Sequence, residues 1–222
     1  MLGYRDGLGH FNLSELIPSK ESPEEDADTR AAMDRALHAA LHALPGRSLT
    51  GANVHAAVRS IKTRALLTTS ADDLVQHYLQ DGNMQYYSIH PPSFMRAYES
   101  FWTACAQSGN QPSPAFTCLL LQICANASQR LGTPLKQRLE YDLAENNAQT
   151  SRRLFDAADG LSRAMPPGVG NVDMVLRLLL AAAWLKSDGR IVDGWHALSD
   201  AVREAQECGM FVVGRRHDRP SN

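Results

Sequence analysis

The chain has 222 residues, of which 44% are hydrophobic and 21% are charged, and its formal net charge is −2 at pH 7. These values are typical of a globular protein with enough core to fold without disulfides or structural metals. The near-neutral charge excludes a bulk electrostatic attraction for nucleic acid or for an anionic membrane.

Neither export nor membrane insertion is predicted. The N-terminus lacks a basic start followed by an apolar core, so it does not indicate a secretory signal. The most apolar run, Leu178 to Leu185, is eight residues long, whereas a membrane-spanning helix needs about 20. The cysteines show no close pairs of the zinc-ribbon kind and are interpreted as buried thiols (Cys105, Cys118, Cys124 and Cys208). We therefore expect a soluble, intracellular protein without a metal or other cofactor.

The first third of the chain predicts three helices. Residues 1–21 are glycine-rich and irregular, and Ser22 then provides a helix cap, with Pro23 after it and Glu25 three positions on. Apolar residues at helical spacing continue this helix to Pro45-Gly46. Two more helices are expected, over residues 53–67 and from Ser70 to Gly82.

The middle of the chain continues the helical pattern. An extended segment, Met84 to Ile89, leads to His90-Pro91-Pro92, and the next helix is predicted to begin at about Pro92 or Ser93. Further helices are expected over residues 115–130 and 147–165, whereas residues 133–145 are polar, weakly patterned and interpreted as a surface excursion.

The last part, residues 171–211, predicts a helical pair. Asn171 caps a helix that is apolar almost all round, which is typical of a central, buried helix. The second helix is amphipathic and ends at Gly209, where a left-handed cap is expected. Six of its residues are predicted to face inward (Ile191, Val192, Trp195, Leu198, Val202 and Ala205). No convincing strand is found, so the predicted fold class is all-α, a multi-helix bundle or stacked antiparallel helical hairpins.

Metal chemistry has weak support. His38 and His42 lie four apart on one helix face, which is metal-ligand spacing, but the glutamate of a zincin is replaced by Ala39. Asp72-Asp73 is similar to the start of the magnesium site of the all-α terpene cyclases, although Gln76 stands where another acid is needed. We interpret the histidines as surface residues and the aspartates as part of a helix start.

Other motifs are weaker still. Gly168-Val169-Gly170 has neither the preceding strand nor the third glycine of a phosphate loop. The basic run from Arg215 to Arg219 is compatible with phosphates or a nuclear import receptor, but more often such a run is a solvated chain end. The aromatic residues from Tyr86 to Trp102 are typical of a core. Their alternative is a small-molecule pocket near residues 86–102, in an all-α enzyme or a ligand-binding protein.

Two segments resemble a known family. The first, Tyr87-Ser88-Ile89-His90-Pro91-Pro92-Ser93-Phe94, is similar to the His-x-Pro-x-Phe neighbourhood of the middle homology (regulatory) domain of fungal binuclear zinc-cluster transcription factors. His90, Pro92 and Phe94 keep the spacing of that motif, and an amphipathic helix precedes it, as in the family.

The second segment is the helical pair at residues 171–211. The family has an apolar helix, a short turn with glycine, a small residue followed by Trp, two alanines, and Gly-Leu. The corresponding positions in this chain are Gly189, Gly194-Trp195, Ala201, Ala205 and Gly209-Met210. The resemblance covers roughly residues 70–212.

The resemblance implies a nuclear transcription regulator of metabolic genes, including secondary-metabolite clusters, and no enzymatic activity. The family's zinc module needs six closely spaced cysteines, so zinc and direct DNA binding are not carried over to this chain. A protein partner is expected instead, either a full-length zinc-cluster regulator or a second copy in a homodimer. We expect a helical regulatory domain over residues 22–213 that ends earlier than the family's domain, followed by a basic flexible tail over 214–222.

Overall fold

A computed structural model describes residues 23–45, 71–107, 111–165 and 171–210. Within these ranges every regular element is a helix, which confirms the all-α class. The predicted helix at 53–67, the glycine pair at 168–170 and the basic tail at 214–222 lie outside the described residues. The division of the chain at residues 1–21, 22–213 and 214–222 therefore stays a prediction.

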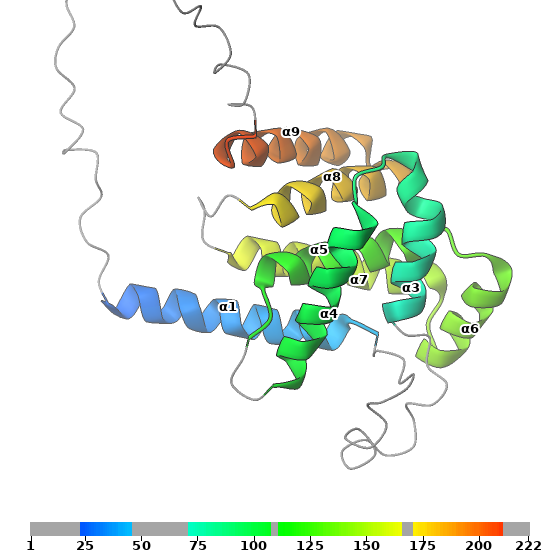
Figure 1. The fold of residues 1–222 in the computed structure, drawn as a ribbon, viewed down its shortest axis with the longest axis horizontal. Helices are drawn as coiled ribbons and strands as arrows, with labels where there is room; N and C mark the ends of the chain where they lie inside the picture. Colours follow the sequence, from blue (N-terminus) through cyan, green and yellow to red (C-terminus); the bar gives the residue numbers. More distant parts are fainter. Residues whose placement is uncertain (1–22, 46–70, 108–110, 166–170, 211–222) are drawn as a thin grey trace, which may run out of the picture.

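The described helices stack in layers. Figure 1 shows α9 and α8 along one edge, α5 and α7 in the middle and α1 on the opposite side, with α3 and α4 across the viewed face. In chain order the elements are α1 (Pro23–Ala43), α3 (Ala71–His77) with a π-helical turn (Tyr78–Gly82) and a 3-10 turn (Asn83–Gln85), α4 (Pro91–Ala106), α5 (Pro114–Ser128), α6 (Thr133–Leu143), α7 (Asn147–Ala164), α8 (Val172–Ser187) and α9 (Ile191–Glu207).

The central helix is α5, which corrects the prediction that the first helix of the C-terminal pair is central. Thirteen of the fifteen residues of α5 are buried, because α1, α3, α7 and α8 all pack around it. Helix α8 packs on α5 and on α9 but leaves one side partly exposed, with Val172 at 49% exposure. A helix that is apolar almost all round is therefore buried on most sides, but it need not be the central helix of the fold.

Two further boundaries differ from the sequence prediction. Residues 133–143 form helix α6, although only Leu139 of this helix is buried, so the surface position was predicted correctly and the conformation was not. Helix α4 begins at Pro91, one residue earlier than expected. His90 is in the extended conformation before it, and proline suits the first turn because its missing N–H has no partner there in any case.

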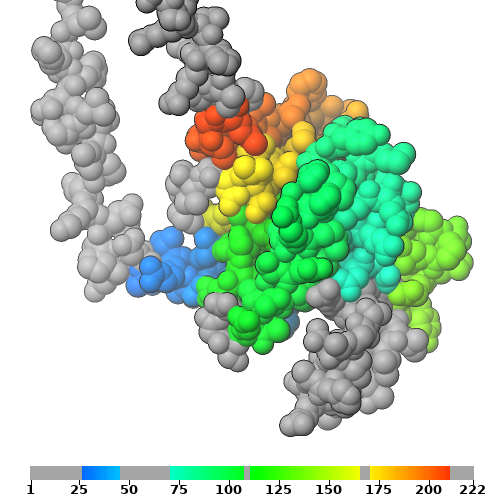
Figure 2. Space-filling view, in the orientation of Figure 1, coloured from blue at the N-terminus to red at the C-terminus, as the bar shows by residue number. Residues whose placement is uncertain are grey.

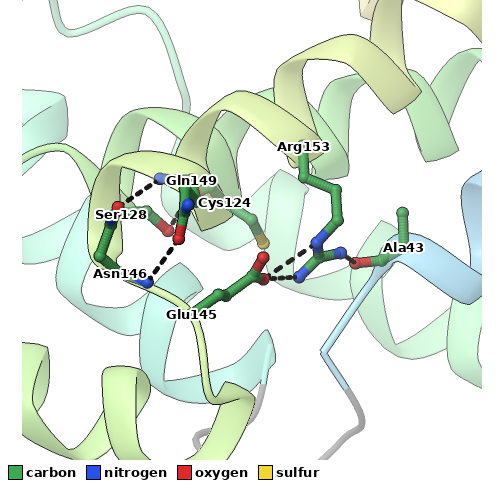
Figure 3. A network of polar contacts seen from close by, with 7 residues as sticks. All are labelled: Ala43, Cys124, Ser128, Glu145, Asn146, Gln149 and Arg153. Atoms are coloured by element: carbon green, nitrogen blue, oxygen red, sulfur yellow. Dashed lines mark hydrogen bonds and ion pairs between the residues drawn. The ribbon is translucent and has the colours of Figure 1, made fainter.

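Helix α7 is fixed at its start and to its neighbour by polar contacts (Figure 3). Asn146 and Gln149 form a reciprocal capping box at its N-terminus. One turn on, the guanidinium of Arg153 donates to Glu145 Oε1 at 2.6 and 3.0 Å and to the carbonyl of Ala43 at 2.7 Å. The last contact satisfies a carbonyl at the end of α1, where no backbone N–H is available, and so holds α1 against α7.

Candidate functional site

The segment between α3 and α4 is held in a fixed shape by one buried side chain. The carboxamide of Asn83 donates to the carbonyl of Ile89 at 2.8 Å and accepts from its N–H at 3.0 Å. This clamp closes the loop over residues 84–88, in which Tyr87 has a positive φ of 48°. A left-handed backbone is unfavourable for tyrosine, so the loop depends on the clamp for its conformation.

The clamp presents Tyr86 beside the C-terminal helical pair. Gln85 donates a 3.2 Å hydrogen bond to the Tyr86 hydroxyl, and Arg130, just after α5, in turn contacts Gln85. The clamp therefore fixes the backbone around Tyr86, and Gln85 fixes its hydroxyl, while 42% of the residue stays exposed. The sequence prediction had assigned Gly82-Asn83 only the role of ending a helix.

Helices α8 and α9 form a tight antiparallel hairpin. Gly189 has a φ of +79° in the turn, and the N–H of Arg190 returns to the carbonyl of Leu185 at 2.9 Å. At the other end, Glu204 of α9 accepts from the N–H of Asn171, the residue that caps α8. Gly209 closes α9 with a φ of +72°, as its sequence position predicted.

The two helices approach closely through small residues on α9. A methyl group at Gly194 would lie 3.2 Å from the carbonyl oxygen of Ala182, so α9 comes near the backbone of α8 at this point. Ala201 and Ala205 are buried on the same side, at 4% and 6% exposure, with Ala197 partly buried between them and Gly194. This row of small residues, and not the larger apolar residues, is the face of α9 that packs inward.

The predicted inward face of α9 is therefore wrong for all of its large residues. The small-residue row and the large apolar residues lie about a quarter turn apart on the helix. Close packing of the first against α8 directs the second outward. The exposed fractions are 59% for Ile191, 68% for Val192, 66% for Trp195, 37% for Leu198 and 46% for Val202.

Three of these exposed residues, Ile191, Trp195 and Leu198, border an apolar groove. Its volume is about 360 Å³, and its walls are α8, the start of α9 and the loop that carries Tyr86. Small residues form much of its surface, and the charged ammonium of Lys186 stands among otherwise uncharged side chains (the lining residues are Tyr86, Leu179, Ala182, Ala183, Lys186, Ile191, Gly194, Trp195 and Leu198). Figure 2 shows the cyan segment that contains Tyr86 beside the orange start of α9. We refer to this surface as the α8/α9 groove.

The family-motif residues His90, Pro92 and Phe94 do not line this groove; Tyr86, in the loop before them, does. His90 is exposed and its Nδ1 is 2.8 Å from the hydroxyl of Ser93, while Pro92 is exposed in the first turn of α4. Phe94 is buried and its ring lies 5.5 Å from that of Phe116 in α5. These three residues thus shape the start of α4, and Tyr86 upstream of them makes the contact with the C-terminal pair.

The aromatic residues of α4 form a core, as the sequence favoured, and the alternative of a pocket near residues 86–102 does not arise from them. Phe94, Tyr98 and Phe101 are buried and pack on one another and on Phe116, so they fill the core. Tyr86 is the member of that predicted set that lines the α8/α9 groove.

The residues considered for metal binding have other contacts or stand apart. Asp72 accepts a 2.7 Å hydrogen bond from the Tyr98 hydroxyl, and Asp73 forms an ion pair with Arg138. The rings of His38 and His42 are 4.4 Å apart on an exposed face of α1. In the part of the chain that the structure describes, no three His, Cys, Asp or Glu side chains are grouped as ligands. Of the helices described, none is both long and apolar enough to cross a membrane.

Two curated proteins are similar to this chain. The probable transcription factor sol4 of Alternaria solani is 30% identical over 145 residues, which cover 63% of this chain and 25% of that protein. The transcription factor xilB of Penicillium rubens is 26% identical over 147 residues, which cover 64% of this chain and 21% of that protein. The chain thus spans about a quarter of the length of these relatives, or less.

No protein-family model and no solved structure matches the chain. Both relatives are named as transcription factors, and they come from two different fungi. This similarity agrees with the resemblance found in the sequence, because the matched part of the chain is similar to fungal transcription factors.

Proposed function

We propose that the chain is a helical regulatory domain of the middle homology type, which controls transcription by docking another protein on the α8/α9 groove. By the resemblance of its two sequence segments, the genes it controls are metabolic, with secondary-metabolite clusters among them, and it acts in the nucleus. The observation that carries the proposal is the outward position of Trp195, which is 66% exposed beside an apolar groove.

Exposed tryptophan at a groove favours protein recognition. Tryptophan is among the residues most enriched at the energetic centres of protein interfaces, and contiguous exposed apolar patches mark such sites. The net charge of −2 offers no general attraction for DNA phosphates, so the proposed role uses contact with protein and not with DNA. The helix hairpin of α8 and α9 also gives the groove a rigid wall, which limits the entropy lost on binding.

A tethered transcription assay tests this role. The chain is fused to an unrelated DNA-binding domain and expressed in a filamentous fungus with a matching reporter gene. We expect the fusion to change reporter transcription relative to the DNA-binding domain alone, and Trp195→Ala to abolish most of that change. A fluorescent fusion of the same chain is expected to accumulate in the nucleus.

The matched control is Tyr141→Ala. Tyr141 is an aromatic residue on α6 with 84% exposure, so its loss removes a similar side chain away from the groove. The control is expected to act like the unmodified fusion. A fusion that leaves the reporter unchanged, or equal effects of the two substitutions, would contradict the proposed function.

A further inference from the structure

We propose that the occupant of the α8/α9 groove is a second copy of this chain, so that the domain forms a symmetric dimer through α9. This inference rests on the proposed function in one respect, which is that both use the α8/α9 groove as the binding site. The dimer itself follows from four properties of the surface: the spacing of its apolar residues, the placement of its charges, its shape and its extent.

The exposed apolar residues of α9 have the spacing of a helix-pairing seam. Ile191, Trp195, Leu198 and Val202 are separated by four, three and four residues. This is the alternating spacing of the a and d positions in a coiled coil, which places side chains where a facing helix can interdigitate with them. Helix α9 has seventeen residues, so the seam runs over about three turns of it.

The apolar seam of α9 carries no charged side chain. All four seam positions are apolar, and the charged residues of α9 lie off the seam. Arg190 pairs with Asp193 at 2.7 Å and Arg203 pairs with Asp200 at 2.8 Å, in each case within the same chain. A helix that faces the seam therefore buries no charge of α9. The ammonium of Lys186 borders the groove from the exposed end of α8, and its flexible stem lets it stay in water at the rim of the contact.

The surface is complementary to itself. It contains both a large protruding side chain, Trp195, and a hollow with small residues at Ala182, Ala183 and Gly194. In a symmetric contact each copy presents the same patch, so the indole of each can enter the hollow of the other. The indole of each copy thus acts as a knob that fits the hollow of the other copy, in an interface formed by the same patch on both.

The extent of the patch matches the apolar centre of a dimer interface. A monomer's largest exposed apolar patch is about 300–600 Å², and a stable complex buries about 800 Å² on each partner. Trp195 and Tyr86 are aromatic residues of roughly 150–250 Å² each, of which 66% and 42% are exposed and can be covered by a partner. Together with Ile191, Leu198 and Val202 they supply the apolar part of such an area.

Sedimentation equilibrium of the purified chain at micromolar concentrations tests the dimer. We expect a reversible monomer–dimer equilibrium, and tryptophan emission that shifts to shorter wavelength as the concentration rises. Trp195→Ala should remove this shift, because Trp184 is already buried in the single chain. Trp195→Ala and, separately, Val202→Glu are expected to weaken the dimer about tenfold or more. Both positions are exposed, so circular dichroism should show unchanged helix content, and Tyr141→Ala should leave the dimer intact.

A chain that stays monomeric over this range overturns the inference. So does a dimer that neither substitution weakens, because the contact would then lie elsewhere. If the chain is monomeric and the reporter still depends on Trp195, the groove binds a different protein and the proposed function survives. If the dimer forms through Trp195 but the reporter does not respond, the dimer stands and the proposed function fails.

Discussion

The indole N–H of Trp184 on α8 donates a 2.8 Å hydrogen bond to the hydroxyl of Ser151 on α7. The same hydroxyl donates to the carbonyl of Ala125 on α5 at 2.7 Å, so one serine joins three helices. The indole is 1% exposed and is stacked on Phe155, with ring centroids 4.1 Å apart. This junction fixes α8, and with it the wall of the α8/α9 groove, to the core of the molecule.

Replacing this serine removes the acceptor of a buried donor. We expect Ser151→Ala to lower the free energy of unfolding by about 1–3 kcal/mol, because the indole N–H of Trp184 stays buried without a partner. Urea unfolding followed by circular dichroism measures the change. Ser199→Ala is the matched control, since that hydroxyl is exposed and bonds only the carbonyl of Trp195 in its own helix; its effect should stay within about 0.5 kcal/mol.

A second prediction concerns the buried arginine of α8. The side chain of Arg177 is 4% exposed and pairs with Asp159 at 3.0 Å. Asp159→Asn leaves this guanidinium without its counter-charge, and we expect a loss of about 2 kcal/mol in unfolding free energy. Asp200→Asn breaks an exposed pair with Arg203 and should cost at most about 1 kcal/mol. Equal losses in the two variants would show that burial of the pair does not matter.

The helices and their ends could largely be predicted from the sequence, whereas their order in the core could not. The cap at Asn171 and the left-handed Gly209 depend on local chemistry, and both were found as predicted. Helix α5 is central although it contains polar residues such as Thr117 and Ser128. Their hydroxyls bond carbonyls one turn earlier, at 2.8 Å in each case, and so can be buried in the centre.

The candidate site was missed because two faces of α9 compete for burial. Hydrophobic area favours turning Trp195 and Ile191 inward, and the sequence prediction followed that preference. Close packing against α8 favours turning Gly194 and the alanines inward instead. Which face is buried thus depends on the shape of α8, which the sequence of α9 alone does not show. The clamp of Asn83 on Ile89 likewise joins residues six apart in an irregular loop, which no periodic pattern indicates.

Thiol reactivity provides a third prediction. Burial raises the pKa of Cys118 and of Cys124 to about 12, so both are protonated and shielded near pH 8. The predicted burial of the thiols is wrong for Cys105, which is exposed, and for Cys208, which is half-buried. We expect a thiol-reactive aromatic disulfide to label the native chain at these two and to reach the other two only after unfolding. A double variant with Cys105→Ser and Cys208→Ser should stay unlabelled when native. Rapid labelling of that variant would contradict the burial of α5.

The same pKa shifts predict how stability depends on pH. The folded chain holds protons on Cys118 and Cys124 up to about pH 12, whereas the ordinary thiol pKa is 9.0. Between these values the folded state binds more protons than the unfolded state, so the free energy of unfolding falls as pH rises. The slope is at most about 1.4 kcal/mol per pH unit for each thiol. Urea unfolding at pH 8 and pH 10.5 measures it, and Cys118→Ala should reduce the slope.

A pair of glycines tests the close approach of α8 and α9. Gly160 lies in α7 with open space around the position of a Cβ, so Gly160→Ala should stabilise the chain by about 0.5–1 kcal/mol through helix propensity. Gly194→Ala gains the same propensity but places a methyl group 3.2 Å from the carbonyl oxygen of Ala182, a backbone atom that cannot rotate away. We expect a net loss of stability for this variant, measured by thermal unfolding of both proteins side by side. If Gly194→Ala stabilises the chain as much as Gly160→Ala, the two helices lie farther apart than the structure places them, and the outward position of Trp195 loses its cause.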